Sequence, residues 1–190
     1  YILFLDADDF ISLNALSVVY DEAKRNNADV VSYMDVDLST DIRVLAAAVK
    51  QVVSNNCDIC IGSRLLPDSK VRNRSLCRGF ISRSYSLMFR VLFLVSFKDA
   101  QCGFKVMSKS FLDKVLPHVK DPGWFFDTEL LILSEKSQYK ICEIPVIWTD
   151  DPDSKVNVMK TAWEDIKGLF RLRFGGLSVC KTVISDRCSK

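Results

Sequence analysis

The feature that most constrains the fold of this chain is an apolar run that ends in two aspartates. Residues 30–34 are mostly apolar, and Asp35 and Asp37 follow one residue apart, with polar residues at 39–41. This order predicts a buried strand whose carboxyl end carries carboxylates, with a capped helix shortly after it. Alternation along the strand would point both aspartates to the same side. Two such carboxylates repel each other, which favours a divalent cation between them; two solvated aspartates at a strand end are the alternative.

The chain contains an earlier copy of this plan. Residues 5–8 match residues 34–37, and residues 26–30 match residues 55–59, both at an offset of 29 residues. Two copies are too few for a solenoid. They predict two successive strand–helix units, each with Asp-x-Asp at the end of its strand, and therefore a parallel sheet.

Composition limits the class of protein. With 190 residues, 48% hydrophobic and 26% charged, the chain predicts one folded globular domain. The formal net charge of +2 is too small to indicate a nucleic-acid partner. Seven cysteines and no signal peptide predict reduced thiols in the cytoplasm. Cys57 and Cys60 have no second pair that would complete a zinc site, and the single histidine, His118, disfavours Ser-His or Cys-His catalysis.

A basic segment occupies the middle of the chain. Gly62-Ser63-Arg64 predicts a turn that exposes a guanidinium at the carboxyl end of a strand. The segment from Arg72 to Phe97 then interleaves arginines with large apolar residues. This pattern fits an ordinary amphipathic helix with a solvated basic face, or a helix that lies on an anionic membrane or grips a phosphate. The apolar run within it is too short to span a bilayer.

The second half is less regular. Gly103, within residues 99–105, predicts a close approach of the backbone to a neighbour. Residues 124–131 place two acids at the start of a helix, where the helix dipole favours them. Residues 141–148 predict a strand at a sheet edge because of its proline, and residues 161–173 predict a last amphipathic helix.

Five stretches of the chain, taken in order, resemble a family 2 glycosyltransferase with the GT-A fold. They are MDVDLSTD, IGSRLLPDS, DAQCGFK, WFFDTELL and EIPVIW followed by DPDSKV, between Tyr33 and about Arg173. The branch that they resemble transfers sugars to polyprenyl or dolichyl phosphate. Residues 1–32, with YILFLDADDF, resemble the Asp-x-Asp region of another branch of the same family.

The resemblance implies an α/β fold with a mainly parallel, Rossmann-like sheet and helices on both faces. It also implies that the fold is incomplete at the amino terminus, because the nucleotide-binding strand and turn that open the family are not found. The expected organisation is a single partial domain over 1–176, with the duplicated unit at 1–32 and 33–62 and a tail at 177–190. A fragment or a fusion of two homologues would have this organisation.

The resemblance also assigns roles. It implies inverting transfer from a nucleotide-sugar donor to a polyprenyl phosphate acceptor, with Mg²⁺ or Mn²⁺ as cofactor, by a protein peripheral to the inner face of a membrane. Asp35 and Asp37 would hold the metal, with Ser39 and Lys155 also at the donor. The matched acceptor-phosphate and catalytic positions are Ser63, Arg64, Arg78 and Ser82 for the acceptor, and Asp37, Asp127 and Glu129 for catalysis.

Two alternatives stay open. The order of Asp35 and Asp37 after an apolar strand also fits a haloacid-dehalogenase-like phosphatase, with Asp35 as nucleophile, Asp37 as acid/base and Asp150-Asp151 at its metal. In that case the lysine and the acidic motif of the phosphatase would converge on Asp35. The other alternative is a catalytically impaired fragment that keeps the fold and binds a membrane or a partner.

Overall fold

The computed structural model describes residues 2–5, 13–35, 37–150 and 158–188. The strands are β1 Ile2–Leu5, β2 Val30–Asp35, β3 Ile59–Ser63, β4 Lys70–Arg72, β5 Phe104–Ser108, β6 Ile141–Pro145 and β7 Ile147–Thr149. The helices are α1 Leu13–Arg25, α2 Leu45–Val53, α3 Leu76–Phe93, α4 Lys109–Val115, α5 Phe126–Lys136, α6 Val158–Arg171 and α7 Val179–Cys188. Short 3₁₀ turns at Ile42–Val44 and Leu116–His118 and a π-helical stretch at Leu172–Gly176 complete the list.

The main sheet has five strands in the order β1-β2-β5-β3-β6. β1 pairs in parallel with β2, and β3 pairs in parallel with β6, whereas β5 runs antiparallel to both of its neighbours. Four strands therefore point the same way, which confirms the predicted mainly parallel sheet. β4 and β7 form a separate parallel pair beside it.

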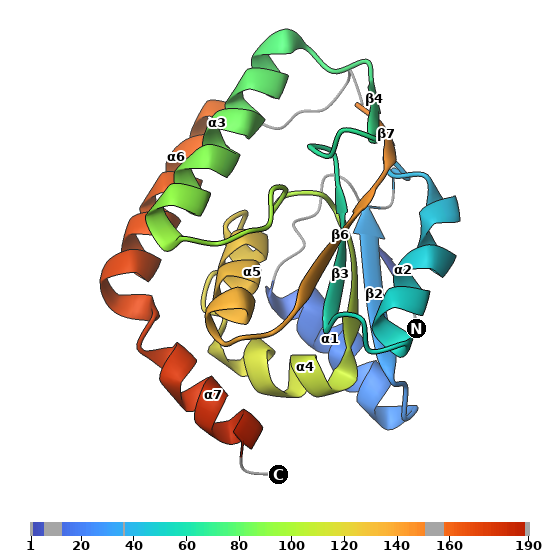
Figure 1. The fold of residues 1–190 in the computed structure, drawn as a ribbon, viewed down its shortest axis with the longest axis vertical. Coiled ribbons are helices and arrows are strands. Elements are labelled where there is room, and N and C mark those ends of the chain that lie inside the picture. Colours follow the sequence, from blue (N-terminus) through green and yellow to red (C-terminus); the bar gives the residue numbers. More distant parts are fainter. Residues whose placement is uncertain (1, 6–12, 36, 151–157, 189–190) are drawn as a thin grey trace.

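Helices cover both faces of the sheet, as predicted (Figure 1). Val31 and Tyr33 of β2 face the larger core, which α1, α3, α4, α5 and α7 also line. Met34 faces the smaller core under α2, with Ala48 and Val52. The alternation of buried side chains on β2 follows from the period of two in a strand, which lets a continuous apolar run serve two cores.

Both Asp-x-Asp strands lie in the sheet, next to each other, with Leu5 opposite Asp35. The helix that follows each strand ends at an asparagine in the left-handed region, Asn27 (φ 50°) after α1 and Asn55 (φ 55°) after α2. Asparagine tolerates this conformation, so the repeated asparagines mark equivalent helix ends. The two units are not equivalent in the sheet, because β5 inserts between β2 and β3.

The rest of the chain follows the predicted order, with two differences. The strand predicted over residues 141–148 is two strands, because β6 ends at Pro145 on the sheet edge and β7 pairs with β4. The segment treated as a tail contains α7, which packs on α4 and buries Cys180 and Val183 in the larger core. The amphipathic helix predicted over residues 161–173 is α6, which begins and ends within three residues of those bounds.

Candidate active site

The carboxyl end of β2 delivers Asp35 to a tight junction with the loop before β5. The Asp35 amide donates to the Gly103 carbonyl (3.0 Å), and the Leu38 amide donates to the Asp35 carbonyl (3.1 Å). Leu38 has a φ of 53°, so the chain turns sharply after the strand. The strand therefore ends at Asp35, and Asp37 belongs to the turn that follows rather than to the strand.

Gly103 allows this junction, as predicted from the sequence. A Cβ at this position would lie 1.9 Å from Oδ2 of Asp35, so no side chain other than glycine fits here without displacing the carboxylate. Burial, and then the charges of Asp37 and Asp127, raise the pKa of Asp35 to about 6, although Lys105 and Arg64 offset part of this effect. Asp35 thus lies in a cluster that carries excess negative charge.

Asp37 is exposed and its carboxylate is held by Ser39. The Ser39 amide donates to Oδ1 of Asp37 (2.9 Å) and the Ser39 hydroxyl donates to Oδ2 (2.5 Å). Ser39 therefore orients the second aspartate in this structure. Just beyond it, Asp41 caps the 3₁₀ turn that leads into α2, which confirms the predicted capped helix.

Asp127 lies in the first turn of α5 and faces the same cluster. Its Oδ1 accepts a hydrogen bond from the Tyr33 hydroxyl and lies 3.0 Å from Nζ of Lys105. Lys105 is completely buried; its ammonium also donates to the Cys102 carbonyl (2.8 Å) and lies 5.3 Å from the centroid of the Tyr33 ring. Asp127 is therefore fixed on two sides, by a buried cation and by a buried phenol.

Glu129, the third predicted catalytic acid, has different neighbours. It is buried, and its Oε2 accepts from Nη2 of Arg171 (2.8 Å) and from the amides of Lys120 and Asp121. These contacts fasten α5 to the end of α6. The structure brings Asp35, Asp37 and Asp127 together and engages Glu129 elsewhere.

Arg64 does not expose its guanidinium, which corrects the expectation from the Gly-Ser-Arg turn. Its side chain is 10% exposed and forms a two-point ion pair with Asp99 (2.8 and 2.9 Å), and the Arg64 amide donates to the same carboxylate (2.8 Å). Burial opposes the charged form of each partner, but the attraction between them prevails, so the pKa of Asp99 is lowered and that of Arg64 is raised. The pair is thus a buried, fully charged one.

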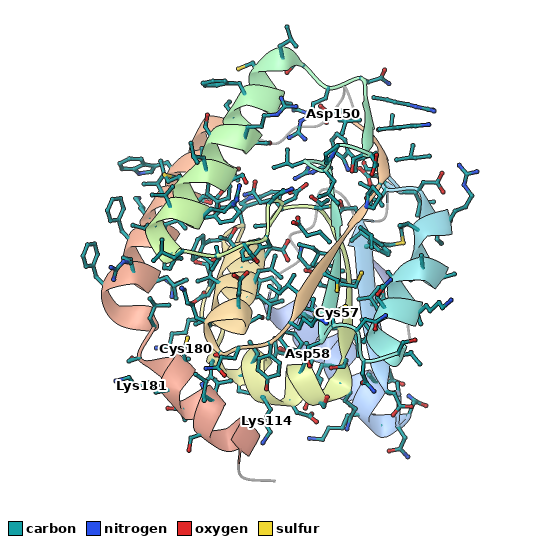
Figure 2. The ribbon with its side chains drawn as sticks, viewed as in Figure 1. Cys57, Asp58, Lys114, Asp150, Cys180 and Lys181 are labelled. Atoms are coloured by element: carbon teal, nitrogen blue, oxygen red, sulfur yellow. The ribbon has the colours of Figure 1, made fainter. Side chains whose placement is uncertain are left out.

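Two further arginines lie near Arg64. Nη1 of Arg78 bonds to Asp150 (2.9 Å), whose label in Figure 2 lies near the first turns of α3, and Arg74 donates to the hydroxyl of Ser82. The guanidinium carbons of Arg64 and Arg74 lie 5.2 and 5.3 Å from the Trp148 ring centroid. Burial, and then the charges of Arg64 and Arg78, lower the pKa of Arg74 to about 10, although Asp99 and Asp150 oppose this.

We call Arg64, Arg74 and Arg78 the arginine cluster. It faces two carboxylates, Asp99 and Asp150, and one guanidinium nitrogen, Nε of Arg74, is buried with no hydrogen-bond partner among the described residues. The cluster is therefore one positive charge in excess of its paired acids. An excess of positive charge favours the binding of an anion at the arginine cluster.

The remaining predicted positions divide into two groups. Ser63 is fully buried at the end of β3, and its hydroxyl has no partner in the described part of the chain. Lys155, Asp151 and the upstream pair Asp6 and Asp8 lie outside the described residues. Within the described ranges, no three Asp, Glu, His or Cys side chains form a group that could hold a metal ion by themselves. The thiols of Cys57, Cys60, Cys77, Cys102, Cys142 and Cys180 are free.

Four neighbours of the site were not assigned a role from the sequence. They are Tyr33, Arg74, Asp99 and Lys105. Lys105 lies on the same face of β5 as the buried Met107, so a charged residue on an apolar strand was the available signal. Nothing local marked Tyr33, because its partner lies 94 positions away.

No family model matches the chain. Glycosyltransferase AglD of Haloferax volcanii is 36% identical over 141 residues, which cover 74% of this chain and 22% of that protein. Dolichyl-phosphate beta-glucosyltransferase of Saccharomyces cerevisiae is 28% identical over 147 residues, covering 73% of this chain and 44% of that protein. The Dictyostelium discoideum enzyme of the same name is 29% identical over 126 residues, covering 65% and 38%. The chain thus spans less than half the length of each of these relatives.

Solved structures agree in fold. Glucosyl-3-phosphoglycerate synthase of Mycobacterium tuberculosis, in complex with Mn²⁺, UDP and glucosyl-3-phosphoglycerate, superposes with a TM-score of 0.55 over 85% of this chain and 53% of that one, at 13% identity. The predicted GT-A fold and the predicted resemblance are confirmed. The phosphatase alternative needs Asp150 beside Asp35, but Asp150 pairs with Arg78. The chain thus shares the GT-A fold and is similar in sequence to glycosyltransferase AglD and to dolichyl-phosphate beta-glucosyltransferases.

Proposed function

We propose that this protein transfers a sugar, with inversion, from a nucleotide-sugar donor to polyprenyl or dolichyl phosphate. One observation carries the proposal. The loop at residues 99–103 joins a cluster short of positive charge to a cluster short of negative charge, through Gly103 at Asp35 and Asp99 at Arg64. A metal-bound diphosphate complements the first cluster and a phosphate acceptor complements the second.

The residues at the end of β2 fit a divalent cation. Mg²⁺ and Mn²⁺ are commonly held by one or two carboxylates together with substrate phosphates, so Asp35 and Asp37 suffice without a third acid. The charge repulsion that raises the pKa of Asp35 is the repulsion that a cation would relieve. When bound, the metal would stabilise the charge of the departing nucleotide diphosphate. Ser39 then keeps Asp37 oriented, and Lys155 remains the proposed second cation at the donor.

The acceptor needs positioning more than activation, because a phosphate is already an anionic nucleophile. Arg74, which donates to Ser82, and Arg78 provide guanidinium groups, and a guanidinium binds phosphate oxygens at two points. Arg64 would not bind the acceptor directly, because its guanidinium is paired with Asp99. Attack by the acceptor phosphate in a single displacement would invert the configuration at the sugar carbon.

Asp127 is the acid that we assign to positioning at the reacting centre. Lys105 and Tyr33 hold its carboxylate beside Asp35. It would orient a sugar hydroxyl there, a role that an ionised carboxylate performs as acceptor only. For Glu129 the contacts with Arg171 favour a structural role over a catalytic one.

A membrane surface is the partner that fits the outer face of α3 and α6. On α3, Leu76 is 93% exposed and Phe80 71%; along α6 and the π-helical stretch, Trp163 is 58% exposed and Phe174 80%. Both helices lie on the side of the molecule away from α2 (Figure 1). None of the described helices is both long and apolar enough to cross a bilayer. We propose peripheral attachment at the inner face, where a lipid-linked phosphate would meet the arginine cluster.

The experiment measures transfer of labelled sugar from a panel of nucleotide sugars to dolichyl phosphate in anionic vesicles. We expect label in the lipid phase with Mn²⁺, its loss with EDTA, and its loss in Asp37→Asn but not in Asp68→Asn, an exposed aspartate outside the site. Transfer that ignores EDTA would contradict the metal role. Nucleotide binding without transfer would identify a catalytically impaired fragment instead.

A further inference from the structure

The loop at residues 99–103 contacts charged residues of both clusters. Asp99 pairs with Arg64, the Cys102 carbonyl accepts from Lys105, and the Gly103 carbonyl accepts from the Asp35 amide. A shift of this loop would displace both clusters at once. What fixes the loop is therefore part of how the site is built.

The loop has a further tether, on α6. Nε2 of Gln101 donates to Oδ2 of Asp165 at 2.6 Å, across 64 positions of sequence. Asp165 is only 3% exposed although α6 is a surface helix, with Trp163 exposed two residues earlier. Its other oxygen, Oδ1, is buried and has no hydrogen-bond partner among the described residues. Burying a carboxyl whose second oxygen makes no hydrogen bond costs free energy. The position of Asp165 therefore calls for a reason other than solubility.

Among the described residues, the charged groups with the largest effect on Asp165 are acids. Burial and then the charges of Asp121, Glu164 and Asp127 raise its pKa to about 7, while the bond from Gln101 lowers it. The hydroxyl of Tyr85 on α3, bonded to Thr128, lies near the same carboxyl. The described neighbours of Asp165 thus offer it acids and hydroxyls, and Gln101 is the partner that it binds.

We propose that Asp165 is a positioning residue that, through Gln101, holds the loop at residues 99–103 in the conformation that places Asp35 and Arg64. The link makes α6, whose outer side carries Trp163, a support of the site. Its significance for catalysis rests on the proposed function, whereas the link itself does not. A competing role is simple packing of α6, for which the identity of the Gln101 partner would not matter.

Hydrogen exchange of the full chain distinguishes these roles. In Asp165→Ala we expect exchange at the Asp35 amide and at residues 99–103 to accelerate about tenfold or more, with the sheet amides of β3 unchanged. Asp165→Asn keeps an acceptor for Gln101 and should exchange like the parent chain, as should the matched control Glu164→Gln. Unchanged exchange in Asp165→Ala, or equal acceleration in Asp165→Asn, would overturn the proposal.

A second variant shows whether the effect of Asp165→Ala comes from loss of this hydrogen bond or from misfolding. Gln101→Ala removes the same bond from the loop side, so it should accelerate the same amides, and the double variant should add little. Additive effects of the two substitutions would overturn the link.

A binding measurement tests the part of this proposal that rests on the proposed function. Where the parent chain binds UDP-glucose with Mn²⁺, Asp165→Ala should weaken this binding about tenfold and Asp165→Asn should retain it. Faster exchange with unchanged affinity would overturn the positioning role. A parent chain that binds no nucleotide sugar would refute the proposed function, and the exchange measurement would still decide whether Asp165 holds the loop.

Discussion

The acidic end of β2 and the arginine cluster are two unbalanced charge clusters that differ in sign. At the first, Asp35, Asp37 and Asp127 face one buried cation, Lys105, and the pKa of Asp35 rises to about 6. At the second, three arginines face two acids, and the pKa of Arg74 falls to about 10. Each shift opposes the charged form of the residue, and in each case burial is the largest cause.

The difference lies in how each cluster is held. Asp35 is fixed by the backbone of Gly103, whereas the arginines are fixed by side chains, Asp99, Asp150 and Trp148. Backbone restraint acts on the amide and carbonyl of Asp35 rather than on its carboxylate. Side-chain restraint engages Nε and Nη2 of Arg64 with Asp99 and leaves Nε of Arg74 without a hydrogen-bond partner among the described residues. The acidic cluster is thus suited to a metal, and the basic cluster presents one arginine supported by others.

The largest effect is expected on stability at the basic cluster. Arg64→Ala leaves the buried Asp99 carboxylate unpaired, so the free energy of unfolding should fall by about 3–5 kcal/mol in denaturant titrations. The control is Arg43→Ala, which breaks the pair with Asp41 that lies at the surface; its effect should be small. If the free energy of unfolding falls by a similar amount in both variants, the Arg64–Asp99 pair contributes no more than a surface pair, which contradicts this prediction.

A second effect, dependent on pH, is expected at Asp165 on α6, which holds the loop between the two clusters. The folded-state pKa of Asp165, about 7, exceeds the unfolded value, so the folded protein binds the proton more tightly and loses stability as pH rises from about 4 to 7. Asp165→Asn should remove this loss and be more stable than the parent chain at pH 8, by up to about 4 kcal/mol. Thermal and denaturant unfolding across this pH range measures it. A constant difference between the two chains at all pH values would contradict the assignment.

Metal binding should show a third, more modest effect. Because the pKa of Asp35 is about 6, the proton competes with the cation below that pH. The affinity for Mn²⁺ with UDP-glucose should therefore fall about tenfold between pH 7 and pH 5, as Asp35 becomes protonated. Titration calorimetry with this diphosphate diester, which does not itself titrate in the range, provides the measurement. An affinity independent of pH would remove Asp35 from the metal site.

Local patterns were enough to predict most of the fold. The period of two at residues 30–35, the asparagines after α1 and α2, and Pro145 at the sheet edge each report a local preference that the structure keeps. The position of β5 between β2 and β3 was not predictable in this way, because strand order depends on contacts between segments about 70 residues apart.

The site was predicted less completely than the fold. Asp35, Asp127 and the arginines of α3 were identified, but their partners were not. The burial of Arg64 depends on Asp99, 35 positions later, and the tether of Gln101 depends on Asp165, 64 positions later. Pairing of this kind leaves no periodic signal in the sequence. The helix in residues 177–190 was missed because its amphipathic pattern is weak and its burial comes from packing on α4.

One crossed binding experiment tests the central claim that the two clusters take different ligands. Calorimetry would measure Mn²⁺ with UDP-glucose, and dolichyl phosphate in detergent, against the parent chain, Asp37→Ala and Arg78→Ala, with Arg83→Ala as the exposed control on α3. We predict that Asp37→Ala loses the nucleotide sugar and keeps the lipid phosphate, that Arg78→Ala does the reverse with about a tenfold loss, and that Arg83→Ala changes neither. If Asp37→Ala and Arg78→Ala each weaken both ligands equally, the two clusters form one undivided site and the claim is wrong.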